Sequence, residues 1–216
     1  LDALRILKEE GEDVPIVGNL TGPVSTASSV MEPVVFYKEL RKKNEDAHAF
    51  MQFVTDQLIR FGRAQIEAGA DVIAISDPSA TGEILGPKYF REFTVRYVNQ
   101  IVDAMKEAGA QTIVHICGHM NPVYKEVDEI HSDALSFDSV VPMKEAREEL
   151  KERTLMGNVS TYTLEFGDPD KVETLARNCV KNGSDIIAPA CGLGMRSPLA
   201  NIRAILQAVR EEENHA

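Results

Sequence analysis

The residues best suited to chemistry in this sequence are a histidine and a cysteine in the segment "IVHICGHM" at positions 113–120. His115 and Cys117 stand two positions apart inside an apolar run that predicts a buried strand. Side chains two apart on a strand point to the same face. An imidazole nitrogen and a thiolate sulfur are both ligands that zinc prefers. The pair by itself also fits a packed core, with Cys117 as a small hydrophobic residue and His115 hydrogen-bonded.

Two further ligand-type residues stand at the ends of other predicted strands. Cys191 lies in "PACGLG", and Asp138 ends the strand that follows the histidine–cysteine pair. One imidazole and two thiols, with a carboxylate beside them, form a zinc set, and three protein ligands plus one exchangeable position are typical of a catalytic site. Cys179 differs from these residues because it shares a helical face with Val172 and Leu175, so we interpret it as a packing residue.

Short apolar segments alternate with helical patterns along the chain. The predicted strands are 15–20, 71–76, 111–116, 134–137, 154–159 and 185–190. The predicted helices are 34–43, 46–68, 88–108, 122–129, 142–151, 169–182 and 198–212. Gly69, Gly109 and Gly183 each follow a helix, where a left-handed C-terminal cap favours glycine. The strands are rich in Val, Ile and Leu, which suits strands that are buried on both faces of a parallel sheet.

Repeated βα units build either a doubly wound sheet or a (β/α)8 barrel. No G-x-G-x-x-G motif follows the first strand, which weakens the dinucleotide-binding version. We therefore predict an α/β fold of the (β/α)8 TIM-barrel type, in one domain over residues 1–216 that holds roughly the last six βα units. A barrel needs eight strands, so we expect the full-length protein to supply two N-terminal ones. Barrel chemistry gathers at the C-terminal strand ends, where His115, Cys117, Asp138 and Cys191 stand.

Composition narrows the classes of partner. The chain has 216 residues with 23 basic and 34 acidic side chains, so its formal net charge is −11. Such an acidic surface repels phosphates and argues against non-specific nucleic-acid binding. No apolar run reaches the roughly 20 residues that a membrane helix needs, and three cysteines are too few for a disulfide framework. We expect a soluble, cytoplasmic protein without a nucleic-acid or membrane partner; homo-oligomers stay open.

Four segments carry a resemblance to a known family. "GNLTGPVSTASSVM", "ADVIAISDPSATGEILGPKYFREF", "HICG" and "PACGLG" together resemble the methylcobamide:coenzyme M methyltransferases of the uroporphyrinogen decarboxylase-like superfamily. The resemblance runs along essentially the whole chain. It implies a TIM barrel whose zinc is held by His115, Cys117 and Cys191, which are then also the catalytic residues. It further implies that Asp138 completes the zinc shell when substrate is absent.

The resemblance also implies a reaction. A methyl group would pass from a methylcobamide, carried by a corrinoid protein, to a small thiol such as coenzyme M, as in methanogenesis. Two alternatives stay open: a uroporphyrinogen decarboxylase-type carboxy-lyase, and a non-catalytic truncated barrel that binds a corrinoid protein. The sequence does not indicate which thiol is methylated or which compound supplies the methyl group.

If the thiol is coenzyme M, its sulfonate needs hydrogen-bond donors or a positive charge. Candidates are Ser25, Thr26 and Ser79 in loops after the strands, and Arg196 after the last strand. Hydroxyls in such loops are equally typical of turns, and Arg196 also fits a plain surface position. Asp77 either orients His115 from behind or begins a turn together with Pro78.

Overall fold

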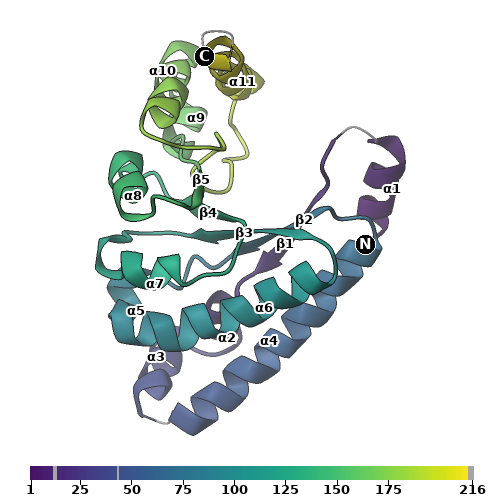
Figure 1. Cartoon of the computed structure of the whole chain (residues 1–216), viewed down its shortest axis with the longest axis vertical. Helices are drawn as coiled ribbons and strands as arrows, with labels where there is room; N and C mark the ends of the chain where they lie inside the picture. Colours follow the sequence, from purple (N-terminus) through teal and green to yellow (C-terminus); the bar gives the residue numbers. More distant parts are fainter. Residues whose placement is uncertain (12–13, 43, 214–216) are drawn as a thin grey trace. The chain divides into compact units, whose positions relative to one another are not determined.

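The computed structural model describes residues 1–11, 14–42 and 44–213, in which strands alternate with helices (Figure 1). The strands are β1 (Val17–Thr21), β2 (Val72–Ser76), β3 (Gln111–Ile116), β4 (Ala134–Phe137) and β5 (Thr154–Met156). The helices are α1 (Asp2–Glu10), α2 (Pro23–Val30), α3 (Pro33–Lys42), α4 (Asn44–Glu67), α5 (Gly82–Tyr89), the π-helix η1 (Phe90–Val95), α6 (Arg96–Glu107), the 3-10 helix η2 (Asn121–Val123), α7 (Tyr124–Asp128), α8 (Met143–Glu149), α9 (Thr161–Phe166), α10 (Pro169–Lys181) and α11 (Leu199–Glu213).

The chain forms two compact units, one of residues 1–116 and 120–133 and the other of residues 117–119 and 134–216. The expectation of a single domain over 1–216 stays a prediction. No helix in the described part of the chain combines the length and the apolar character needed to cross a membrane.

In the first unit, β1, β2 and β3 pair in parallel, with Val17 opposite Val72 and Ser76 opposite His115. Helices α4 and α6 pack against each other, and they contact these strands (Figure 1). Burial alternates along β1 and β2, and Ile73 and Ile75 are both fully buried. The expected burial on both faces is therefore wrong for these strands, because only one face is fully covered. It is right for β4, where all four residues are buried.

Helix and cap predictions hold in most places. Gly69, Gly109 and Gly183 follow α4, α6 and α10 with φ of +107°, +92° and +95°, so the predicted left-handed caps are confirmed. The helix predicted over 88–108 is confirmed in extent but not in type. It runs on from a kink at Gly86, passes through the π-helix η1 and ends as α6.

In the second unit, β4 and β5 pair in parallel, with Leu135 opposite Leu155. The strand predicted over 185–190 is present only as two isolated parallel bridges, Met156 to Ile186 and Val159 to Pro189. Backbone hydrogen bonds still follow this segment, since the N–H of Gly157 donates to Ile186 and that of Val159 donates to Ala188.

A separate apolar cluster in this unit joins α9, α10 and α11 through Leu164, Val172, Ala176, Ala204 and Ala208. Taken together, five strands and one strand-like segment alternate with helices. This confirms the α/β class and fits about six βα units of a barrel.

Candidate metal centre

Two of the predicted ligands meet within the second unit. The Sγ atoms of Cys117 and Cys191 lie 3.7 Å apart. Cys191 follows Ala190, whose N–H donates to the carbonyl of Val159 at 2.8 Å. Cys191 therefore lies at the C-terminal end of the segment 186–190, which pairs beside β5. Cys191 is exposed and Cys117 is half-buried.

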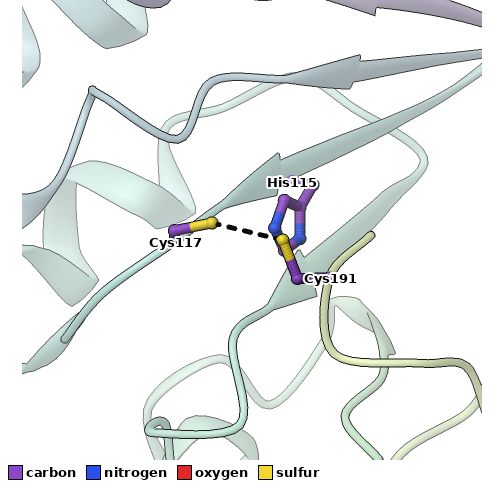
Figure 2. Close-up of side chains that lie close together, drawn as sticks. All are labelled: His115, Cys117 and Cys191. Atoms are coloured by element: carbon purple, nitrogen blue, oxygen red, sulfur yellow. Dashed lines mark hydrogen bonds between the residues drawn. The ribbon is translucent and has the colours of Figure 1, made fainter. Parts of the chain in front are cut away.

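His115 precedes Cys117 by two residues and lies near the end of β3. Burial alternates along that strand, so His115 shares a partly exposed face with Ile113, while Val114 and Ile116 are buried on the other face. Figure 2 shows the side chains of His115, Cys117 and Cys191 close together. One ligand atom from each of them lies within 4.8 Å of the other two. The structure thus brings the three predicted ligands together.

The spacing of the sulfurs suits zinc. A tetrahedral ion with Zn–S bonds of about 2.3 Å holds two sulfurs about 3.8 Å apart. The observed 3.7 Å matches that separation without a change of backbone. Two sulfurs and one imidazole nitrogen are also the donor types that select zinc over calcium or magnesium.

The protein groups around Cys117 oppose a thiolate. Burial, the neighbouring Cys191 and the Asp138 carboxylate together raise the pKa of Cys117 to about 12. A divalent cation reverses this effect, because a coordinated thiol gives up its proton. The pair of cysteines is therefore suited to a cation and poorly suited to carry negative charge without one.

Asp138 lies in the turn after β4, outside the group of three ligand atoms. Its Oδ1 accepts hydrogen bonds from the N–H of Val140 at 3.2 Å and from the Ser139 hydroxyl at 3.3 Å. The same turn is held by Asn158, whose Nδ2 donates to the carbonyls of Asp138 at 2.9 Å and Val141 at 2.8 Å. The role of Asp138 as a fourth ligand stays a prediction.

Sequence reasoning missed Asn158. Its only signal was a polar residue just after β5, in "GNVS". Its side chain connects that segment to the turn that carries Asp138, and such a long-range hydrogen bond has no local pattern in the sequence.

Three of the predicted substrate-binding residues meet in the first unit. The fully buried Asp77 carboxylate accepts from the N–H of Ser25 at 2.6 Å and from that of Val24 at 3.1 Å. The Oγ of Ser25 in turn accepts from the N–H of Ser79 at 2.8 Å. These donors are engaged inside the protein. The backbone N–H of Asp77 donates to the carbonyl of His115 at 2.9 Å, which links the turn after β2 to β3.

The other two predicted substrate-binding residues differ from this cluster. The Thr26 hydroxyl donates to the carbonyl of Thr21 at 3.3 Å, as a local turn would require. Arg196 is exposed in the segment between Cys191 and α11. Cys179 is 7% exposed within the apolar cluster of the second unit, which confirms it as a packing residue.

The sequence is similar to proteins of one family along nearly its whole length. The family model described as uroporphyrinogen decarboxylase (URO-D) matches residues 1–212. The methylcobamide:CoM methyltransferase MtaA of Methanosarcina barkeri is 33% identical over 98% of this chain and 62% of its own length. A uroporphyrinogen decarboxylase of Chlorobaculum tepidum is 26% identical over 98% of the chain and 64% of its own length.

Among solved structures, a methyltransferase from Methanosarcina mazei superposes with a TM-score of 0.91 at 33% identity. That match covers 98% of this chain and 63% of the solved one. The chain thus spans less than two thirds of the length of these similar proteins.

Proposed function

The chain belongs to the uroporphyrinogen decarboxylase (URO-D) family, and within that family we propose that the protein acts as a zinc-dependent methyltransferase. It would move a methyl group from a methylcobamide, carried by a corrinoid protein, to a small thiol such as coenzyme M. Its similarity to methylcobamide:CoM methyltransferases supports this choice of donor and acceptor.

The observation that carries this proposal is the donor set. Cys117 and Cys191 offer two sulfurs at 3.7 Å, and His115 adds a nitrogen donor two residues before Cys117. Three protein ligands leave one tetrahedral position for a substrate atom, which is the arrangement of a catalytic zinc. A zinc ion bound there would take up the substrate thiol as thiolate at neutral pH.

The chain's own residues would hold the acceptor and shape its surroundings. Two cysteine thiolates and one neutral imidazole balance the charge of the ion, which keeps a further sulfur electron-rich and nucleophilic. In the transfer, the S–C bond forms as the Co–C bond breaks, and the electron pair of that bond stays on cobalt. The thiol proton would leave beforehand. We assign Asp138, in the adjacent turn, as the group that gives way to the acceptor and takes up that proton.

The distribution of arginines favours this proposal over a decarboxylase. Uroporphyrinogen carries many carboxylates, so a site for it needs several cationic side chains. Among the residues that the structure describes, Arg196 is the single arginine in a segment that follows the C-terminal end of a strand or strand-like segment; Arg153 precedes β5, and the others lie on helices.

The first test is metal content together with thiol methylation. We expect about one zinc per chain, and loss of the zinc in Cys117→Ser, with Cys179→Ser as the matched control that keeps it. Methyl transfer from methylcobalamin to coenzyme M should also need Cys117. The change in absorbance of the corrin measures this transfer. Loading the chain with zinc and finding neither stoichiometric binding nor methyl transfer would contradict the proposal. Release of CO2 from uroporphyrinogen would instead support the decarboxylase alternative.

A further inference from the structure

We propose that Cys117 and Cys191 are also an oxidation site: when no metal is bound, hydrogen peroxide converts the two thiols into an intramolecular disulfide. The bond would remove both sulfur ligands in one step and close the metal centre. Reduction by a dithiol would restore it.

The sulfurs are already in contact. Their 3.7 Å separation must shrink to about 2.05 Å for a disulfide. Both residues belong to the second unit, so the closure takes place within that unit.

The backbone next to Cys191 has room for that shift. Cys191 is followed by Gly192, where an added Cβ would meet no atom within 4 Å. On the other side, Gly118 follows Cys117 with a φ of +81°. Neither cysteine lies within a helix or strand that would have to break.

The order of the steps follows from exposure. Cys191 is exposed, so its sulfur meets the peroxide first and takes one oxygen as a sulfenic acid, while the O–O bond breaks and one water leaves. The Cys117 thiol then attacks the Cys191 sulfur and gives up its proton only as the new bond forms, because its surroundings disfavour a free thiolate. The S–S bond forms, the S–O bond breaks, and the thiol proton departs in a second water. Two thiols are oxidised by two electrons, and one peroxide is reduced to two waters.

The third cysteine provides an internal control. Cys179 is buried in the apolar cluster of the second unit, where the N–H of Asn158 donates to its sulfur at 3.4 Å. Since the chain has three cysteines, the disulfide should leave one free thiol, that of Cys179.

This inference does not need the proposed function, because the disulfide forms in the absence of metal. A bound zinc would hold both sulfurs and should slow the oxidation. This second expectation, slower oxidation with zinc, does rest on the proposed function. Disulfide formation without metal and protection by zinc can therefore be refuted separately.

In the experiment, a chelator first removes any metal from the full chain, and one equivalent of hydrogen peroxide is then added. The remaining thiols are blocked with N-ethylmaleimide, and the peptides are mapped without reduction. We expect the thiol count to fall from three to one and a linked pair of peptides that contain Cys117 and Cys191. Dithiothreitol should return all three thiols. Cys179→Ser should form the same link, whereas Cys117→Ser should leave Cys191 unlinked, as a sulfenic acid that has taken up one oxygen. Circular dichroism checks that each variant is folded.

Two outcomes would overturn the inference: over-oxidation of Cys191 in the wild-type chain without a link, or links that involve Cys179 or join two chains. A disulfide in a chain that never binds zinc would leave the inference standing while the zinc proposal falls. If the chain binds stoichiometric zinc but forms no disulfide after the metal is removed and peroxide is added, the zinc proposal stands and the disulfide inference falls.

Discussion

The carboxylate of Asp77 accepts a hydrogen bond from the backbone N–H of Ser25 at 2.6 Å, although 52 residues separate them in the sequence. A second bond, from the N–H of Val24 at 3.1 Å, completes the cap of α2. The N-terminus of a helix favours an anion, and here the protein supplies its own. The amides of Val24 and Ser25 are therefore occupied by Asp77 and do not offer a site to a substrate anion.

Gly22 is expected to be essential to this cap. A Cβ at this position would lie 2.4 Å from Cβ and Cγ of Asp77. Gly22→Ala should lower the free energy of unfolding by about 1–3 kcal/mol, as overpacking typically does. The matched control is Gly192→Ala, where a Cβ meets nothing within 4 Å and the change should stay within about 0.5 kcal/mol. Urea unfolding of both variants measures the difference, and equal midpoints would refute the steric argument.

Asp77 should also give the protein a distinctive dependence on pH. Burial raises the pKa of its carboxyl from the ordinary 3.8 to about 6. Between these two pH values the folded chain holds a proton that the unfolded chain has lost, so stability falls as pH rises through this window.

The loss over that window amounts to about 3 kcal/mol, at roughly 1.4 kcal/mol per pH unit. Asp77→Asn has no such titration. Between pH 4 and pH 6.5, which covers most of that window, the stability difference between wild type and variant should therefore shift by about 2 kcal/mol in favour of the variant. Urea unfolding across the range tests this, and parallel curves for the two proteins would rule it out.

Arg196 is predicted to select a sulfonated thiol. A charge-assisted hydrogen bond contributes about 1.5–3 kcal/mol, or roughly 10- to 100-fold in affinity. Arg196→Gln should raise KM for coenzyme M by about that factor and leave KM for 2-mercaptoethanol, which lacks the sulfonate, unchanged. Arg203→Gln, at an exposed position on α11, serves as the control. If both thiols respond equally to Arg196→Gln, the residue does not recognise the sulfonate.

Asp138 is predicted to be the fourth zinc ligand until the acceptor arrives. With cobalt(II) in place of zinc, Asp138→Asn should change the absorption spectrum of the substrate-free protein, because one oxygen ligand is altered. With excess thiol the spectra of variant and wild type should coincide. Ser139→Ala removes only a hydroxyl that donates to Asp138 at 3.3 Å and should leave both spectra unchanged. Identical substrate-free spectra for Asp138→Asn and wild type would remove Asp138 from the ligand set.

Local patterns in the sequence were enough to predict the main elements. β3 and β4 have the predicted bounds, 111–116 and 134–137. Gly109 ends the helix before β3, and Asp133 and Asp138 flank the apolar run of β4. Three short helices were missed. α2, α5 and α9 have six to eight residues each, too few for a helical period to stand out, and they follow directly on strand ends. The strand predicted over 185–190 has the right composition, but it pairs only through isolated bridges.

The sequence by itself determined that His115 and Cys117 share one face of a strand, because the two-residue repeat of a strand is a property of the backbone alone. The tertiary structure decided which distant residues join them. The approach of Cys191 to Cys117 depends on the parallel register of the segment beside β5, and the cap of α2 by Asp77 depends on the pairing of β1 with β2. Such long-range contacts depend on the packing of many residues together, so they cannot be predicted from any single stretch of the sequence.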